Sequence, residues 1–252
     1  MVAPLPAPRA VRHLVAAYFP HGAMLEIERV TEGVSTFVYR IMRGGECFYL
    51  RLLPEIGASF APEVHAHVVL RARGVAVPEV VAYEHRHVEV GLSSMLTTEV
   101  SGVPLSRLVA EDERVALLHG AGRDLAIINS IPVAGFGWIV RDSPAMTTLT
   151  AELPTNRAIL LGDLEDNLSL LIRRGLAPFE RTAIERAVEQ FAALLDTPRG
   201  WLAHGDFDPT HIYGQDGRYT GIIDFGEMRG GARTYDLGHF ALRAWEPGGA
   251  RR

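Results

Sequence analysis

The hydrophobic periodicity of the chain changes near Gly102, and this change predicts two lobes of different construction. Before it, segments with the alternation and β-branched content of strands lie at 25–31, 36–42, 48–53, 80–83 and 93–100. One helical segment, residues 63–73, interrupts these strands. After Gly102, apolar residues recur at helical spacing over 112–130, 156–174 and 179–195. We therefore expect an α+β fold of two lobes: an N-terminal antiparallel sheet with one helix (residues 1–98) and a mainly helical C-terminal lobe (residues 99–252).

The composition of the 252-residue chain excludes several classes of protein. Its basic side chains are all arginine, which excludes mechanisms that need a lysine amine, such as the Walker A phosphate site or a PLP Schiff base. No apolar stretch approaches the ~20 residues of a membrane span. The one cysteine, Cys47, has no partner for an internal disulfide, and the net charge of −5 argues against nucleic acid. We therefore expect a cytoplasmic protein with no membrane or nucleic-acid partner.

The segment after residue 200 carries the residues with the clearest chemical meaning. Asp216-Gly217 is a typical hairpin turn between two short strands, the first of which begins at His211. Asp206 precedes this hairpin and Asp224 follows it. The turn therefore brings both carboxylates and the imidazole of His211 to one edge. Two carboxylates and an imidazole there can hold a divalent cation and orient a hydroxyl.

Four motifs in this segment stand at the spacings of one family: His204-Gly205-Asp206, His211, Ile223-Asp224-Phe225-Gly226 and Tyr235-Asp236-Leu237. In these motifs the chain resembles the aminoglycoside phosphotransferase family. The resemblance implies a protein-kinase-like fold of two lobes. It also implies that the γ-phosphate of ATP or GTP is transferred, with Mg²⁺, to a hydroxyl of a small molecule such as an aminoglycoside or another antibiotic.

The resemblance implies a role for each matching residue. Asp206 would be the catalytic aspartate that accepts or orients the proton of the attacking hydroxyl, and Asp224 would bind Mg²⁺ at the phosphates. His211 stands where the family usually has asparagine as a second metal ligand. Because Mg²⁺ prefers oxygen, His211 would contact the metal, a phosphate or Asp206. His204 and Asp236 would brace the catalytic loop.

The N-terminal half resembles the family's nucleotide site less specifically. Gly33, Ser35 and Thr36 would approach the phosphates from the loop between the first two strands, although a plain hairpin turn has the same residues. Arg51 takes the place of the family's usual lysine and would pair with Glu63 in the following helix. An ordinary surface ion pair is the alternative for these two residues.

Residues 95–102 resemble the hinge between the lobes. There the adenine would bond to backbone groups of Thr97 and Glu99, and Met95 would line the base pocket. A strand end followed by a loop would give the same sequence.

The acceptor site is the part that the sequence defines least. Asp163, Glu165 and Asp166 make one region acidic, which would attract a polycationic aminoglycoside, and Glu227 is a further expected contact. A solvated helix face explains the same acidic residues equally well. The chain has Gly231-Ala232-Arg233 where the family usually has Gly-Asp-Pro, so the resemblance does not define the range of acceptors. A sugar or amino-alcohol acceptor stays open, because kinases related to this family share the same motifs.

Two other functions stay open at this point. A metal-dependent hydrolase would use a two-metal cluster, for which the chain offers His204, Asp206, Asp208, His211, Asp224 and His239. A degenerate kinase that only binds nucleotide is the second, because His211 and Arg51 depart from the usual residues. In each case we expect a monomer that acts on or binds a small molecule.

Overall fold

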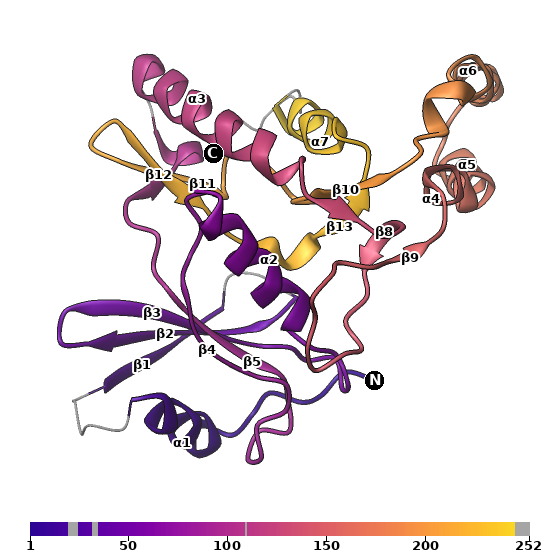
Figure 1. The fold of residues 1–252 in the computed structure, drawn as a ribbon. Helices are drawn as coiled ribbons and strands as arrows, with labels where there is room; N and C mark the ends of the chain where they lie inside the picture. The colour runs from indigo at the N-terminus through magenta and orange to yellow at the C-terminus, as the bar shows by residue number, and fades with distance from the viewer. Residues whose placement is uncertain (20–24, 32–34, 109, 245–252) are drawn as a thin grey trace.

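The computed structural model describes residues 1–19, 25–31, 35–108 and 110–244. Its N-terminal part is built on an antiparallel sheet with the strand order β1-β2-β3-β5-β4 (Figure 1). The strands are β1 (Leu25–Val30), β2 (Phe37–Arg43), β3 (Glu46–Leu52), β4 (Val80–Glu84) and β5 (Ser94–Thr98). Each lies within or overlaps a segment that the periodicity predicts as a strand.

A helix that the sequence analysis does not predict covers one face of this sheet. It is α1 (Pro8–Tyr18), and its Val11 and Leu14 are buried in one cluster with Ile41 and Leu50 of the sheet (Figure 1). The first residue of α1 is Pro8. A helix tolerates proline there because the first amides have no partner within the helix.

The second helix of this lobe, α2 (Ala61–Ala72), lies on the other face, between the sheet and the C-terminal lobe (Figure 1). Its Ala66 and Leu70 belong to the same buried cluster as Leu117 and Ile222 of the C-terminal lobe. The periodicity predicts this helix correctly, and its position joins the cores of the two lobes.

The C-terminal lobe combines helices with two small sheets, and so contains more strands than expected. The sheets have the orders β7-β10-β13-β8-β9 and β12-β11-β6. Their strands are β6 (Val103–Pro104), β7 (Pro132–Val133), β8 (Phe136–Ile139), β9 (Ala151–Leu153), β10 (Gly200–Ala203), β11 (Ile212–Gln215), β12 (Arg218–Ile222) and β13 (Arg229–Gly231). The predicted hairpin is β11–β12. Helices α3 (Glu111–Ile128) and α7 (Tyr235–Ala244) pack beside these sheets (Figure 1).

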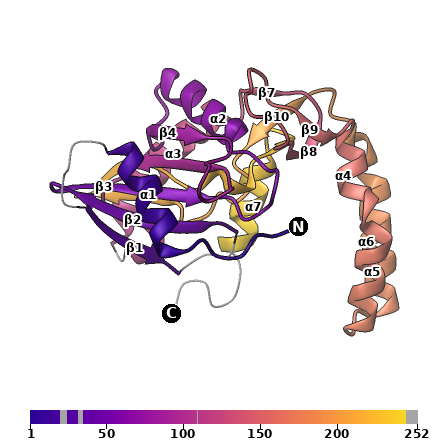
Figure 2. The ribbon, with the colours of Figure 1, turned by 90° about the horizontal axis from the view of Figure 1, so that it is seen from below.

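Three further helices form an arm that projects from the lobe (Figure 2). They are α4 (Asn156–Gly162), α5 (Leu164–Arg173) and α6 (Pro178–Gln190). The expected single helix 156–174 is therefore wrong: it breaks at Asp163, directly after Gly162, a poor residue for a helix interior. The expected helix 179–195 ends early and continues as a 3-10 turn, residues 192–195. No helix in the described ranges is long and apolar enough to cross a membrane.

Candidate active site

A buried carboxylate holds the loop that contains Asp206. Asp236 in the first turn of α7 is fully buried, and its two oxygens accept hydrogen bonds from the backbone amides of His204 and Gly205, each at 2.9 Å. Asn129, which follows α3, donates to the same carboxylate at 2.8 Å. The loop before Asp206 is therefore anchored from two helices that lie far apart in the sequence.

The same loop is joined to the segment that carries Asp224. The ring of His204 donates from Nε2 to the carbonyl oxygen of Ile223 at 2.9 Å and accepts at Nδ1 from the amide of Asp206 at 3.3 Å. Gly205 has a φ of +89°, and a Cβ there would overlap the carbonyl oxygen of Glu227. Both ring nitrogens of His204 have hydrogen-bond partners within the protein, so neither is free to bind a metal. The prediction of His204 as a ligand of a two-metal cluster is therefore wrong.

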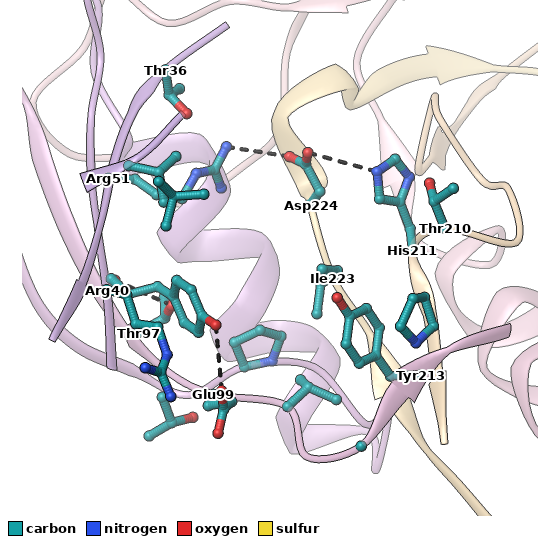
Figure 3. Close-up of a pocket in the computed structure, with 18 of the residues that line it drawn as sticks. Thr36, Arg40, Arg51, Thr97, Glu99, Thr210, His211, Tyr213, Ile223 and Asp224 are labelled. Atoms are coloured by element: carbon teal, nitrogen blue, oxygen red, sulfur yellow. Dashed lines mark hydrogen bonds and ion pairs between the residues drawn. The ribbon is translucent and has the colours of Figure 1, made fainter. Parts of the chain in front are cut away.

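His211 stands between Asp206, the expected catalytic residue, and Asp224, the expected metal ligand. It immediately precedes β11, and its Nδ1–H donates to the backbone carbonyl oxygen of Asp206 at 2.8 Å. The same Nδ1 lies 3.7 Å from Oδ2 of Asp206, and Nε2 lies 3.8 Å from Oδ2 of Asp224 (Figure 3). The hairpin thus brings Asp206, His211 and Asp224 together as the sequence predicts.

Arg51 reaches this group from the N-terminal lobe. It extends from β3, forms an ion pair with the buried Glu63 of α2, and places its other terminal nitrogen 3.4 Å from Oδ1 of Asp224 (Figure 3). Burial opposes charge on Arg51, but Glu63 and Asp224 raise its pKa above the usual value. Burial would likewise raise the pKa of Asp224, yet Arg51 and His211 hold it below the usual value. Arg51 and Asp224 are therefore both charged at neutral pH.

A cavity of about 710 Å³ opens between the lobes beside these residues. Eight of the predicted residues line it: Ser35, Thr36, Arg51, Met95, Thr97, Glu99, His211 and Asp224. Asp224 and His211 lie at one end of the cavity, opposite Thr97 and Glu99 (Figure 3). Gly33 lies outside the described residues. Glu63 and Asp206 do not line the cavity. Glu63 is buried and pairs with Arg51, which lies between it and the cavity.

Some backbone groups of the expected hinge are already hydrogen-bonded to β3. The amide of Glu99 donates to the carbonyl oxygen of Cys47 at 3.2 Å, and Thr97 pairs with Tyr49 in the β3–β5 ladder. Val100 follows β5 by two residues and also lines the cavity.

The expected acceptor residues fall into two separate places. Asp163, Glu165 and Asp166 lie on the projecting arm, and Glu165 is paired with Arg181 of α6 at 2.8 Å (Figure 2). None of these residues lines the 710 Å³ cavity. Glu227 instead lines a second cavity of about 290 Å³ next to the first.

Two residues that support this site are missed by the sequence analysis. Asn129 binds Asp236, and Arg141 donates to the carbonyl oxygen of Gly226. Neither belongs to a recognisable motif, and each acts on a residue far away in the sequence. A third, His239, is predicted only as a metal ligand; its Nε2 lies 3.1 Å from Oδ1 of Asp206.

The predicted two-metal cluster is smaller than expected. Asp206, Asp208 and His211 offer ligand atoms within 4.8 Å of one another, the single group of this kind among the described residues. Oδ1 of Asp208 accepts a hydrogen bond from the amide of Thr210 at 2.6 Å, which also gives it a role in the local turn. Asp224, with 44 % of its side chain exposed, offers carboxylate oxygen to a hard cation beside this group.

Two buried histidines make the stability of the fold depend on pH. Burial lowers the pKa of His67 and of His204, although Glu63 opposes the shift at His67 and Asp236 opposes it at His204. Below about pH 6.5 the unfolded chain therefore binds protons that the folded chain does not. The free energy of unfolding falls there by up to about 1.4 kcal/mol per pH unit for each histidine.

Calorimetry is expected to show a Tm that declines between about pH 7 and about pH 5.5. The variant His67→Gln removes one of these protons, so it should make this decline less steep. A decline of unchanged steepness in the variant would exclude His67 as a source.

Comparisons with known proteins agree with this architecture. Residues 26–252 match the model of the Phosphotransferase enzyme family. The aminoglycoside 3'-phosphotransferase of Enterococcus faecalis is 25 % identical over 229 residues, which cover 85 % of this chain and 78 % of that protein.

Solved structures share the fold. The apo form of a thermostable mutant of aminoglycoside phosphotransferase APH(4)-Ia is similar, with a TM-score of 0.64, 19 % identity, and coverage of 95 % of this chain and 80 % of that one. A ternary complex of such a mutant with ADP and hygromycin B gives 0.63, 18 %, 94 % and 78 % in the same order. These structures confirm the expected two-lobed α+β fold.

Proposed function

The chain belongs to the phosphotransferase enzyme family and is a phosphotransferase, and we propose from this that it transfers the γ-phosphate of ATP or GTP to a hydroxyl of a small molecule. One observation carries the proposal: Arg51, Asp224 and His211 form a continuous row at one end of an interlobe cavity of about 710 Å³. A cavity of that size suits a nucleotide. The row would place a positive charge and metal-binding groups beside the terminal phosphates of that nucleotide.

The lining residues support a defined pose for the nucleotide. Arg51, fixed by Glu63, would bind phosphate oxygens with its planar guanidinium, and the Ser35–Thr36 segment would cover the phosphates. The base would lie against Met95 at the opposite end. Because the amide of Glu99 is committed to Cys47, the backbone of Val100 would meet the base edge instead.

Asp206 would act on the acceptor. Its carboxylate lies on the far side of His211 from Asp224 and is 28 % exposed, so a hydroxyl approaching the phosphate end can reach it. It would accept the hydroxyl proton as the oxygen attacks phosphorus. The anchored loop limits the movement of this carboxylate, and catalysis of phosphoryl transfer depends mainly on such positioning.

The carboxylate of Asp224 fits Mg²⁺, because its oxygens are the ligands that this cation prefers and Arg51 keeps it ionised. When bound, the cation would neutralise charge on the phosphate oxygens. His211 would then contact a phosphate or complete the ligand set through Nε2, since its Nδ1–H is already donated to the carbonyl of Asp206.

The acceptor would be an aminoglycoside or another hydroxylated antibiotic, with a sugar or amino alcohol as the alternative. Similar proteins are an aminoglycoside 3'-phosphotransferase and an enzyme found with hygromycin B. Glu227 would contact the acceptor, because its backbone adjoins Gly205 of the catalytic loop. On the arm, Asp163 and Asp166 would reach only an acceptor that extends beyond the cleft.

A coupled nucleotide-turnover assay tests the proposal. We expect Mg²⁺-dependent release of ADP or GDP that is stimulated by at least one member of a panel containing kanamycin, hygromycin B, simple sugars and amino alcohols. Nucleotide binding without stimulation by any acceptor would instead support the degenerate kinase.

Asp224→Asn is expected to weaken Mg-nucleotide binding rather than the chemical step alone. Asp224 has a φ of +64°, which asparagine tolerates and alanine does not, so this change removes the charge without straining the backbone. Loss of one charged ligand should raise the Kd for Mg-nucleotide by ~10-fold or more, measured by titration calorimetry at several Mg²⁺ concentrations. An unchanged Mg²⁺ dependence would remove Asp224 from the metal site.

The group Asp206, Asp208 and His211 also favours a second candidate, a metal-dependent hydrolase. Such an enzyme would retain a transition metal after dialysis, and elemental analysis detects it. It would also cleave its substrate without nucleotide. The phosphotransferase instead requires nucleotide for every turnover.

A further inference from the structure

One face of the N-terminal half of α7 contacts the catalytic loop. Asp236, His239 and Phe240 stand at positions i, i+3 and i+4, which share one side of a helix. Asp236 binds the amides that precede Asp206, and the ring of Phe240 lies 5.6 Å from that of Phe207. His239 lies between these two contacts and faces the side chain of Asp206.

The imidazole of His239 has an unsatisfied nitrogen at this contact. Nε2 lies 3.1 Å from Oδ1 of Asp206, is shielded from solvent, and has no hydrogen bond in the described structure. Buried polar atoms are almost always hydrogen-bonded, so this nitrogen calls for a partner. Oδ1 is the nearest carboxylate oxygen recorded for it, and a small rotation of either side chain would complete the bond.

The two oxygens of Asp206 have different neighbours. Oδ1 faces His239, whereas Oδ2 lies 3.7 Å from Nδ1 of His211. His211 in turn contacts Asp224, so Oδ2 is the oxygen on the side of the expected phosphates. An interaction that holds Oδ1 would therefore leave Oδ2 directed at the acceptor.

We propose that His239 is a positioning residue for phosphoryl transfer, which donates from Nε2–H to Oδ1 of Asp206 and so aims Oδ2 at the acceptor hydroxyl. This inference rests on the proposed function. In the step that it serves, the hydroxyl oxygen bonds to the γ-phosphorus and the bond from phosphorus to the β–γ bridging oxygen breaks. The nucleoside diphosphate leaves with that electron pair, and the hydroxyl proton passes to Oδ2.

Three substitutions at His239 separate the donor from the bulk of the ring. His239→Gln places an amide N–H near the position of Nε2, His239→Asn places one nearer to Nδ1, and His239→Leu removes the donor. ADP release from MgATP is measured with kanamycin and, in parallel, with water as the only acceptor. We expect the Asn and Leu variants to lose ~10–100-fold in kcat, with KM for MgATP and Tm unchanged, and Gln to recover most of the rate.

Two kinetic results would overturn the proposal. One is a Leu variant whose kcat stays within about threefold of wild type, well short of the loss expected from a misplaced group. The other is a Gln variant as slow as Leu, because the ring itself, and not its donor, would then be what matters. A loss confined to Tm would also reduce His239 to a packing residue.

Nuclear magnetic resonance of histidine-labelled protein tests the contact without any acceptor. The ¹⁵N signals of His239, assigned by their absence in His239→Gln, should show the proton on Nε2. They should shift in Asp206→Asn but not in Asp216→Asn, a matched change in the distant hairpin turn. A proton on Nδ1 of His239 in the wild-type protein would overturn the proposal, whether or not the kinetic variants fold. Signals of His239 that do not shift in the folded Asp206→Asn variant would also overturn it.

The two measurements also separate failure of this inference from failure of the proposed function. Turnover that requires Asp206, together with signals that ignore Asp206→Asn, would remove His239 alone. Signals that respond, together with no turnover of any acceptor, would overturn the proposed function and with it the role of His239 in transfer.

Discussion

Asp206→Asn is expected to lower the rate of phosphoryl transfer by ~10²–10⁴-fold, the range that a positioned general base contributes. Asparagine has the same shape but cannot accept the hydroxyl proton at neutral pH. The loop is held through backbone amides and Asp236, so the substitution leaves its anchor in place. Arg51 and Asp224 are unchanged too, and the Kd for Mg-nucleotide should stay near that of wild type.

The matched control for this substitution is Asp216→Asn. Asp216 is exposed in the β11–β12 turn and has a φ of +50°, which asparagine also adopts readily. Transfer is measured by ADP release, and nucleotide binding by the fluorescence of a labelled nucleotide. Normal turnover by Asp206→Asn would exclude Asp206 as the base, and lost nucleotide binding would show that the variant disturbs the cavity itself.

Asp236→Asn is expected to have the largest effect on stability. The buried carboxylate accepts from His204, Gly205 and Asn129 at 2.8–2.9 Å, and the variant turns an N–H donor toward at least one of these donors. Losing a charge-assisted hydrogen bond and leaving a buried donor unpaired should cost about 2–5 kcal/mol. Chemical denaturation measures this loss, and transfer should fall with it because the catalytic loop loses its anchor.

Glu189→Gln is the control for this prediction. Glu189 is an exposed carboxylate on the projecting arm, and its substitution should change the free energy of unfolding by less than about 0.5 kcal/mol. If Asp236→Asn cost no more than that, the carboxylate would not be what holds the loop.

The sequence predicts the site best where the chain brings its residues together locally. Asp206, His211 and Asp224 flank one tight hairpin, so the Asp216-Gly217 turn alone is enough to place them at one edge. Arg51 and Glu63 are likewise joined by a strand and the helix that follows it. In both cases few residues separate the partners, and turn chemistry limits the arrangements available.

Contacts between segments that lie far apart in the sequence cannot be predicted from such local patterns. Asn129 lies more than a hundred residues from Asp236, and nothing in its local sequence distinguishes it from a residue that ends a helix. The acidic residues of the arm illustrate the reverse error. Asp163 and Glu165 are expected at the acceptor site because their region is acidic. The helix break after Gly162 and the projection of α5 place them on the arm instead (Figure 2).

The guanidinium at the phosphate end of the cavity determines which reagents can label this protein. Arg51 stands where an amine usually does, and the chain has no lysine side chain elsewhere. Acylating probes that capture a kinase through its lysine therefore find no lysine amine in this cleft. A dicarbonyl reagent, which condenses with guanidinium groups, is the suitable probe instead, and bound nucleotide should shield Arg51 from it.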